Sequence, residues 1–329
     1  MPKRTYEQTT AKQTLNRVKD PHMPFSWSIN PYRGCSHGCS FCYARATHTF
    51  LGMKADESFQ HHILVKANAA EALDTQLSKL KRKVNGDLRE VANRVGLVAI
   101  GTATDPYQPI EGKARLTREC LKILAKYHIP TAITTRSPLI LRDLDVLREM
   151  NITSINVSVN TLNHDVYKRL EAASPPPRRR LEVVQALVEN GLSAGIFIAP
   201  ILPYLTDFTV DLDTLITSAK AHRAQYAIPS VLRLSPEVKV WYFRILQEQY
   251  PHLLPAYAKL YANSSYPGRH YVDPVMKRAR SLLRKYALPA NSPDKRNRNC
   301  KSEGAQNQAA SVKNTDAPSP KAEQLSFSF

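Results

Sequence analysis

Three of the five cysteines of the chain lie within eight positions, in the segment NPYRGCSHGCSFCYAR. They are Cys35, Cys39 and Cys42, and their spacing is CxxxCxxC. Three thiolates on one short loop can converge on a soft metal centre. The segment is polar and contains glycine, which is unlike a core segment, so buried inert cysteines explain it poorly. The other two cysteines, Cys120 and Cys300, are far apart in the sequence.

The spacing allows more than one kind of metal site. A structural zinc site takes four ligands, usually as two pairs separated by a long stretch of chain. A fourth ligand is not evident here, although His37 or His48 could serve. A [4Fe–4S] cluster normally takes four thiolates, so three would leave one iron open. An open coordination position is a feature of catalytic rather than structural metal sites.

Polar residues follow three successive apolar runs that have the character of strands. The carboxyl ends of parallel strands form the mouth of a barrel, where the chemistry of such folds takes place. One polar strand end only indicates an approach to solvent, but three in succession favour a site. The residues are Thr102, Thr104 and Asp105, then Thr134, Thr135 and Arg136, then Ser158 and Asn160.

These side chains need a framework that brings them together, and the sequence alternates strand-like runs with segments of helical period. With a first strand near FSWSINPY, the pattern gives six βα units, which implies a parallel sheet with right-handed crossovers. We expect an α/β fold, a partial (β/α)6 TIM-type barrel, with a closed barrel or an open doubly wound sheet as alternatives. The later strand-like runs are 95–105, 129–137, 154–162, 193–203 and 227–234.

The composition divides the chain into four regions. Residues 1–24 are expected to be a flexible basic arm, 25–235 the barrel and 236–290 a helical extension. Residues 291–329 contain almost no large apolar side chains, so they cannot bury enough surface to offset the entropy cost of ordering. We therefore expect a disordered tail there.

The chain has 329 residues and a formal net charge of +18, which suggests a polyanionic partner, most simply nucleic acid, with DNA favoured. A protein with basic tails is the alternative.

No run of eighteen apolar residues occurs, so no membrane span is expected. The amino terminus lacks the apolar stretch of a secretory signal, and an odd number of cysteines with three clustered favours the reducing cytoplasm.

The cysteine spacing, the aromatic Phe41 before the last cysteine and the six βα units together resemble the radical S-adenosylmethionine (SAM) enzymes. GTATDPYQPIE, ITTRSPLILRDLDVL and VLRLSPEV extend the resemblance to the branch related to spore photoproduct lyase, described as DNA-repair photolyase-like. The resemblance implies a [4Fe–4S] cluster, whose open iron chelates SAM, and a 5′-deoxyadenosyl radical. It also implies an electron donor such as flavodoxin or ferredoxin.

The resemblance suggests roles for further residues. Gly101, Thr102 and Asp105 fill the position near the methionine amino group, although Asp105 could equally cap the next helix. Tyr107, with Gln108 and Glu111, either shapes the substrate side or belongs to a rigid turn. The remaining assignments are Ser158 and Asn160 to the ribose, Arg180 to the methionine carboxylate, and Gly195, with Ile196 and Ala199, to the adenine.

The chain also departs from the family pattern. Spore photoproduct lyase has a cysteine hydrogen donor just before the aspartate, whereas residues 101–104 here are Gly, Thr, Ala and Thr. Reversal of thymine dimers by that mechanism is therefore not expected. Cys120 lies in an apolar helical segment and is expected to be buried and inert. With Cys300 it leaves too few thiols for a second cluster.

The last six residues, QLSFSF from Gln324 to Phe329, resemble the peptide by which bacterial repair and replication proteins bind the sliding clamp.

The leading hypothesis from the whole sequence is a single-cluster radical SAM enzyme acting on a nucleic-acid lesion or modified base. One alternative is a zinc-stabilised nucleic-acid-binding module without catalysis. Another keeps the radical chemistry but has a small-molecule or protein substrate.

Overall fold

The structure is a computed structural model that describes residues 4–21 and 23–292. Its centre is a seven-stranded sheet in the order β10-β9-β8-β7-β6-β3-β2, in which β2 alone is antiparallel to its neighbour. The strands are β2 (Asn16–Arg17), β3 (Trp27–Ile29), β6 (Val98–Ile100), β7 (Thr131–Thr135), β8 (Ile152–Ser158), β9 (Ala194–Ile201) and β10 (Ala227–Val231).

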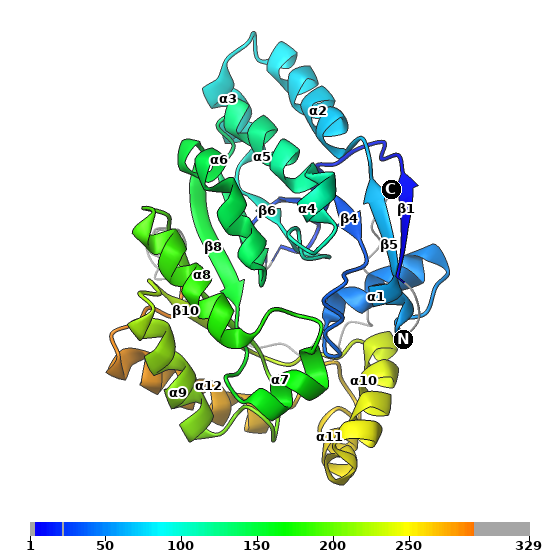
Figure 1. The fold of residues 1–329 in the computed structure, drawn as a ribbon, viewed down its shortest axis with the longest axis vertical. Coiled ribbons are helices and arrows are strands. Elements are labelled where there is room, and N and C mark those ends of the chain that lie inside the picture. The colour runs from blue at the N-terminus through cyan, green and yellow to red at the C-terminus, as the bar shows by residue number, and fades with distance from the viewer. Residues whose placement is uncertain (1–3, 22, 293–329) are drawn as a thin grey trace, which may run out of the picture.

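The strand order decides between the expected architectures. From β3 to β10 it follows the sequence without the reversal that defines a doubly wound sheet. Right-handed crossovers in one direction place every helix on the same face of the sheet, and Figure 1 shows helices around its outside. In the described residues β2 and β10 are the two open edges of the sheet. The predicted partial barrel with six parallel strands is therefore confirmed, and the closed and doubly wound alternatives are wrong.

The crossover helices form because their apolar residues recur at helical spacing. In α5, Thr117, Cys120, Leu121 and Leu124 are buried, so Cys120 lies in the core as expected. Helix α8 begins with a proline in its first turn, and the chain leaves it at Gly191, where φ is +78°. The outer helices are α2 (Ala69–Lys83), α3 (Leu88–Val95), α5 (Leu116–Lys126), α6 (Leu144–Glu149), α8 (Pro177–Glu189) and α9 (Thr209–Ala221).

Several short elements lie near the carboxyl ends of the strands or lead from them into the outer helices. They connect the barrel to its mouth and carry several of the polar residues discussed below. They are η1 (Tyr43–Leu51), α1 (Ser58–His61), α4 (Glu111–Ala114), η2 (Pro138–Asp143) and α7 (His164–Glu171).

The region expected to be a helical extension contains α10 (Pro236–Gln249), η3 (Pro251–Leu253), α11 (Leu254–Leu260) and α12 (Arg269–Lys285). Helix α12 packs on α9 and β10 and so covers the last barrel strand. Helices α10 and α11 form a second apolar cluster that includes Tyr242 and Tyr257, together with Cys39 and Phe41. The extension therefore packs directly against the cysteine segment.

The first residues differ from the flexible arm expected for 1–24. Strand β1 (Thr5–Thr9) pairs in parallel with β5 (His62–Lys66), whose other edge pairs with β4 (Tyr32–Arg33). Most side chains of β1 are exposed, so backbone hydrogen bonds rather than apolar burial hold it in place. A strand of this kind leaves no hydrophobic pattern in the sequence, so the sequence alone does not predict it.

The tail prediction concerns residues 291–329, of which 293–329 lie outside the described residues. Cys300 and the segment Gln324–Phe329 belong to that part, so the expectations about them stay predictions. Among the helices that the structure describes, none combines the length and the apolar character needed to cross a membrane.

Candidate functional site

The three clustered cysteines lie on the loop between β4 and η1, which follows the carboxyl end of β3, the first parallel strand. Cys35 and Cys39 are buried, and Cys42 is partly buried. Cys42 packs against the small apolar cluster that contains Cys35 and also against the larger one that contains Cys39. The three thiols are therefore neighbours at the mouth of the barrel.

Hydrogen bonds join this cysteine loop to the loop after β6. Asn30 donates from Nδ2 to Thr102 Oγ1 at 3.0 Å, and its Oδ1 accepts from the Ala103 amide at 2.9 Å. The fully buried Gln108 accepts from both the amide and the hydroxyl of Ser36, and donates to the Gly34 carbonyl. Thr102 and Gln108 thus stabilise the cysteine loop, a role that the sequence did not indicate.

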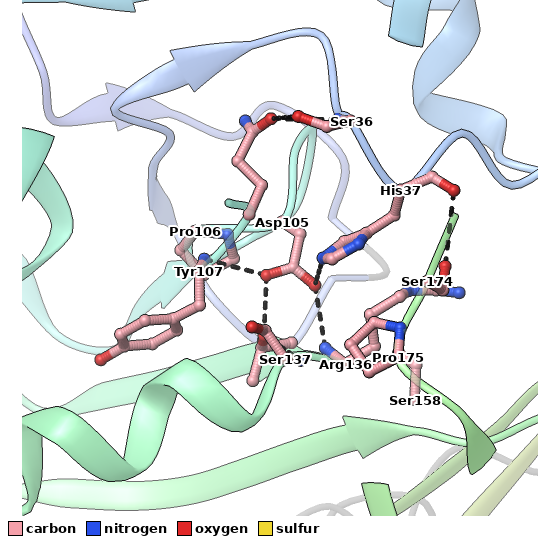
Figure 2. Close-up of polar contacts among 12 residues, drawn as sticks. Ser36, His37, Asp105, Pro106, Tyr107, Arg136, Ser137, Ser158, Ser174 and Pro175 are labelled. Atoms are coloured by element: carbon pink, nitrogen blue, oxygen red, sulfur yellow. Dashed lines mark hydrogen bonds and ion pairs between the residues drawn. The ribbon is translucent and has the colours of Figure 1, made fainter. Parts of the chain in front are cut away.

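The opposite side of the cysteine loop is joined to the segment after α7. Ser40 donates from both its amide and its hydroxyl to the Leu170 carbonyl. The Cys39 Sγ lies 3.5 Å from the Ser174 hydroxyl, and Ser174 also reaches the His37 carbonyl (Figure 2). Two loops from different parts of the barrel therefore hold the cysteine loop on both sides.

Asp105 is the centre of a buried polar network at this mouth (Figure 2). Its Oδ1 accepts from the Tyr107 amide at 2.9 Å and from Thr135 Oγ1 at 2.7 Å. Its Oδ2 accepts from the Arg136 amide at 2.8 Å and lies 3.5 Å from His37 Nε2. The contact with the Tyr107 amide closes a turn and caps no helix, because the next helix, α4, begins at Glu111 after Ile110. The same carboxylate joins the loop after β6 to β7.

The His37 imidazole packs against this carboxylate. Burial is the main cause that lowers the pKa of His37 to about 4, against the opposing effect of Asp105. The imidazole is therefore neutral near pH 7 and contributes no charge to the mouth.

Arg180, predicted to pair with the methionine carboxylate, lies in a buried ion-pair network. Its Nη1 is 3.1 Å from Oε2 of Glu171, which also accepts from Arg136 Nη1 at 2.6 Å. Arg180 donates further to the carbonyls of Pro175 and Ser158. It is fully buried, and its Nη2 has no partner in the described part of the chain.

Arg136 is a cation of the mouth to which the sequence gave no role beyond its place at a strand end. Burial acts to lower the pKa of Arg136, but the charges of Cys39, Glu171 and Asp105 outweigh burial and raise it. Its position directly after β7 could have indicated a role for Arg136 in the site. Glu171, its partner, gave no comparable signal because it lies in helix α7.

At the end of β8, Asn160 carries an amide that is 3% exposed. Neither its Oδ1 nor its Nδ2 has a hydrogen-bond partner among the residues described. A buried amide without partners costs free energy, so a polar ligand at this position would satisfy it. The neighbouring Ser158 is also buried, and its carbonyl accepts from Arg180.

Gly101 has a positive φ of +89°, and a Cβ there would lie 2.2 Å from the Thr134 carbonyl oxygen. Glycine is therefore required at the turn that follows β6. At Gly195 a Cβ would lie 2.3 Å from the Tyr226 carbonyl and would also meet its ring. Gly195 lies near the amino end of β9, so its position fits packing against Tyr226 rather than the adenine contact that was predicted.

Tyr107 does not reach the mouth, contrary to its prediction as a catalytic residue. Its ring is fully buried in the main core, and in Figure 2 it points away from the Asp105 carboxylate. Burial, with Asp143 and Glu111 nearby, raises the pKa of Tyr107. Glu111 is also fully buried, in an ion pair with Arg142 at 2.8 Å. Residues 106–111 thus form a rigid turn in which Tyr107, Gln108 and Glu111 are buried.

The donor set of the cysteine loop fits an iron–sulfur cluster in its chemistry. Burial, then the charges of Asp105, Cys39 and Cys42, raise the pKa of Cys35. A cationic metal would offset the cost of ionising such buried thiols. Within residues 4–21 and 23–292, no three His, Cys, Asp or Glu side chains already surround one metal position. The thiols are thus neighbours rather than a preformed ligand set.

Residues 29–214 match the family model described as the Radical SAM superfamily. An uncharacterized protein of Mycobacterium tuberculosis is 32% identical over 288 residues, which are 86% of this chain and 82% of the relative. An uncharacterized protein of Methanocaldococcus jannaschii is 28% identical over 242 residues, 73% of this chain and 82% of the relative.

Among solved structures, spore photoproduct lyase complexed with dinucleoside spore photoproduct is similar in fold. The TM-score is 0.62 at 15% sequence identity, and the match covers 87% of this chain and 80% of the lyase. A mutant of the lyase with bound AdoMet and dinucleoside spore photoproduct gives the same TM-score. At this identity the similarity concerns the fold.

Proposed function

This chain belongs to the radical SAM superfamily, and we propose that it is a single-cluster radical SAM enzyme acting on a nucleic-acid lesion or a modified base. The family implies a [4Fe–4S] cluster and SAM as cofactors. When bound, these supply a 5′-deoxyadenosyl radical that takes a hydrogen atom from the substrate. Membership of an enzyme family replaces the alternative of a non-catalytic zinc module.

The observation that carries the proposal is the cysteine loop at the mouth of the barrel. Cys35, Cys39 and Cys42 are assigned as the cluster ligands. Gln108 and Ser40 hold the loop from two sides, which orients it toward the carboxyl ends of the strands. Phe41 packs beside Cys39 and excludes water from that side.

The residues assigned to SAM lie around the same mouth. The unpartnered amide of Asn160 supports a contact with the ribose, beside Ser158. Gly101 and Thr102 lie in the turn that the methionine amino group would approach. Asp105 positions that turn through Thr135, and its catalytic role would be to orient rather than to react.

Nucleic acid, with DNA favoured, is the proposed substrate class. The net charge of +18 supports a polyanionic partner. The lyase of similar fold is described as binding dinucleoside spore photoproduct, which supports the same class by analogy only. Because residues 101–104 contain no cysteine, the hydrogen-atom donor must differ from a thiol at that turn.

Two protein partners complete the proposal. A flavodoxin or ferredoxin would deliver the electron. The segment Gln324–Phe329, outside the described residues, would bind the sliding clamp. A peptide spanning 318–329 should bind a bacterial clamp and lose binding on Gln324→Ala and Phe327→Ala. Absence of binding at high micromolar concentration would remove the clamp from the proposal.

The experiment that tests the substrate class begins with anaerobic reconstitution with iron and sulfide, followed by reduction with SAM. Release of 5′-deoxyadenosine is then compared with DNA, RNA, a protein fraction and a small-molecule fraction of cell extract. Stimulation by DNA or RNA supports the proposal. Stimulation by the protein or small-molecule fraction alone would replace it with the remaining alternative, a radical SAM enzyme of another substrate class.

A further inference from the structure

Arg45 lies three residues after the last cysteine of the loop, in η1, and is fully buried. We infer that its guanidinium is a fixed countercharge of the iron–sulfur site, which holds the cysteine loop and raises the reduction potential of the cluster. The inference rests on the proposed function, since it concerns the cluster assigned to Cys35, Cys39 and Cys42.

The guanidinium of Arg45 binds the cysteine loop directly. Its Nε donates to the Cys39 carbonyl at 3.0 Å, and its Nη2 donates to the Gly38 carbonyl at 2.9 Å. On the other side, Nη1 donates to the Asp56 carbonyl at 2.6 Å, and Nη2 to Gln60 Oε1 at 2.7 Å. The planar group therefore fixes the backbone between two of the proposed ligands.

These acceptors satisfy the hydrogen bonds of Arg45, but none of them is a carboxylate oxygen. In the described part of the chain, no Asp or Glu oxygen forms an ion pair with Arg45 within 4 Å. Asp56 offers its backbone carbonyl, while its carboxylate accepts from the Ser58 amide. A buried charge is costly unless it is paired, so an anion on the cysteine loop would stabilise Arg45.

A comparison within the chain makes the difference clear. Arg180 is the other fully buried arginine of the described residues, and Glu171 is its counterion at 3.1 Å. Glu171 also pairs with the guanidinium of Arg136, and Asp105 accepts from the Arg136 amide, so this network contains carboxylates beside its arginines. Arg45 instead donates to the Cys39 and Gly38 carbonyls, inside the segment that carries the three cysteines.

Aromatic side chains shield Arg45 from water. Its guanidinium carbon lies 4.7 Å from the centroid of the Trp241 ring and 5.4 Å from that of Phe59. Burial lowers the pKa of Arg45, and the charges of Cys42, Cys39, Cys35 and Asp56 oppose this change. The guanidinium and the thiols thus interact through a medium with little water, where electrostatic effects are strong.

The consequence concerns the redox state of the site. A cluster held by three thiolates is anionic, and one electron from an external donor makes it more negative. A fixed positive charge nearby stabilises the reduced form more than the oxidised form, so it raises the potential. Arg45 is in these terms a positioning residue, since it acts through the cluster and the loop.

The test uses the full-length reconstituted protein and measures iron content and the midpoint potential by EPR-monitored titration. Arg45→Gln should shift the potential to a more negative value, and Arg45→Lys should keep it near that of the wild type. Arg244→Gln is the matched control, because Arg244 lies on the exposed face of α10 beside Glu248 and is screened by solvent. Its potential should not change.

Gln60→Glu distinguishes the effect of the Arg45 charge from the effect of its hydrogen bonds to the loop. It preserves the acceptor for Arg45 and the shape of the side chain, but adds a counterion that neutralises the guanidinium. A more negative potential with normal iron content supports the inference, even if Arg45→Gln holds no cluster. A wild-type midpoint potential in Gln60→Glu, and in Arg45→Gln if that variant binds a cluster, would overturn the inference. A wild-type protein that binds no iron would instead refute the proposed function.

Discussion

Gln108 connects the turn after β6 to the cysteine loop through every polar atom of its side chain. Its oxygen accepts from Ser36, and its nitrogen donates to the Gly34 carbonyl and to Thr104 Oγ1. All of these groups are buried or nearly so, which makes the network sensitive to the loss of one member.

Gln108→Leu should therefore weaken both the fold and the site. The substitution leaves the Ser36 amide without its acceptor, so we expect a loss of about 1–3 kcal/mol in the free energy of unfolding. Urea denaturation of the apo-protein measures this loss, and iron content after reconstitution measures the effect on the loop. Wild-type values in both measurements would show that Gln108 does not hold the cysteine loop.

Gly101→Ala tests the turn after β6. A Cβ at Gly101 would lie 2.2 Å from the Thr134 oxygen, and its φ of +89° is unfavourable for any other residue. We expect a destabilisation of about 1–3 kcal/mol or more. Gly112→Ala is the matched control, because a Cβ at Gly112 would meet no atom within 4 Å and its φ is ordinary. Equal stability of the two variants in thermal unfolding would contradict this account of the turn.

At this scale the sequence allowed the ligands to be predicted but not the side chains that support them. The cysteine spacing and the polar strand end at Asp105 were visible because each signal is local. Tyr107 was misplaced, since a residue type does not reveal whether its side chain faces a mouth or a core. The supporting roles of Gln108 and Arg45 were not predicted, because their contacts depend on the folded cysteine loop.

Among the elements, the amino-terminal strand β1 has a place beside the site that its composition does not suggest. Arg4, just before β1, donates to the Ser36 carbonyl at 3.3 Å and to the Gln60 carbonyl at 3.2 Å. Downstream of β1, the amides of Thr14 and Leu15 donate to Gln76 Oε1. The segment thus covers one side of the cysteine loop and is fastened at two points.

Deletion of residues 2–9 should leave the barrel folded but expose the cysteine loop. We expect the reconstituted cluster to be lost faster to a chelator or to air, because Arg4 no longer covers the loop. The decay of absorbance near 400 nm measures the rate, and circular dichroism checks the fold. A cluster as long-lived as in the full chain would show that β1 does not protect the site.

The main elements could be predicted because buried strands and amphipathic helices repeat apolar residues at characteristic spacing. Six parallel strands were anticipated in this way, including the short β3. The strand order then selected a partial barrel among the three expected architectures. Strand β1 could not be predicted, since its pairing with β5 depends on backbone groups that every residue has.

For the whole molecule, the excess positive charge should make nucleic-acid binding dependent on salt. Helix α12 presents Lys277, Arg280 and Arg284 as exposed side chains. Replacing all three by Glu should weaken binding to DNA at least tenfold and should reduce the slope of log K against log salt by up to about three. Fluorescence anisotropy at several salt concentrations measures both quantities.

Arg94→Glu is a suitable control for that triple substitution, because Arg94 is an exposed residue of α3 on a different helix. It should change the affinity less than the α12 variant does. If the two proteins bind DNA equally well, α12 is not the face that contacts nucleic acid, and the charge of the chain must act elsewhere.

The central claim is that Cys35, Cys39 and Cys42 together hold a [4Fe–4S] cluster that supports cleavage of SAM. The most direct measurement is the iron content and 5′-deoxyadenosine release of the anaerobically reconstituted protein. The account predicts a loaded, active wild type, loss of both on Cys35→Ala, Cys39→Ala or Cys42→Ala, and retention of both on Cys120→Ala and Cys300→Ala. A wild-type protein that binds no iron, or a triple-alanine variant that still cleaves SAM, would contradict it.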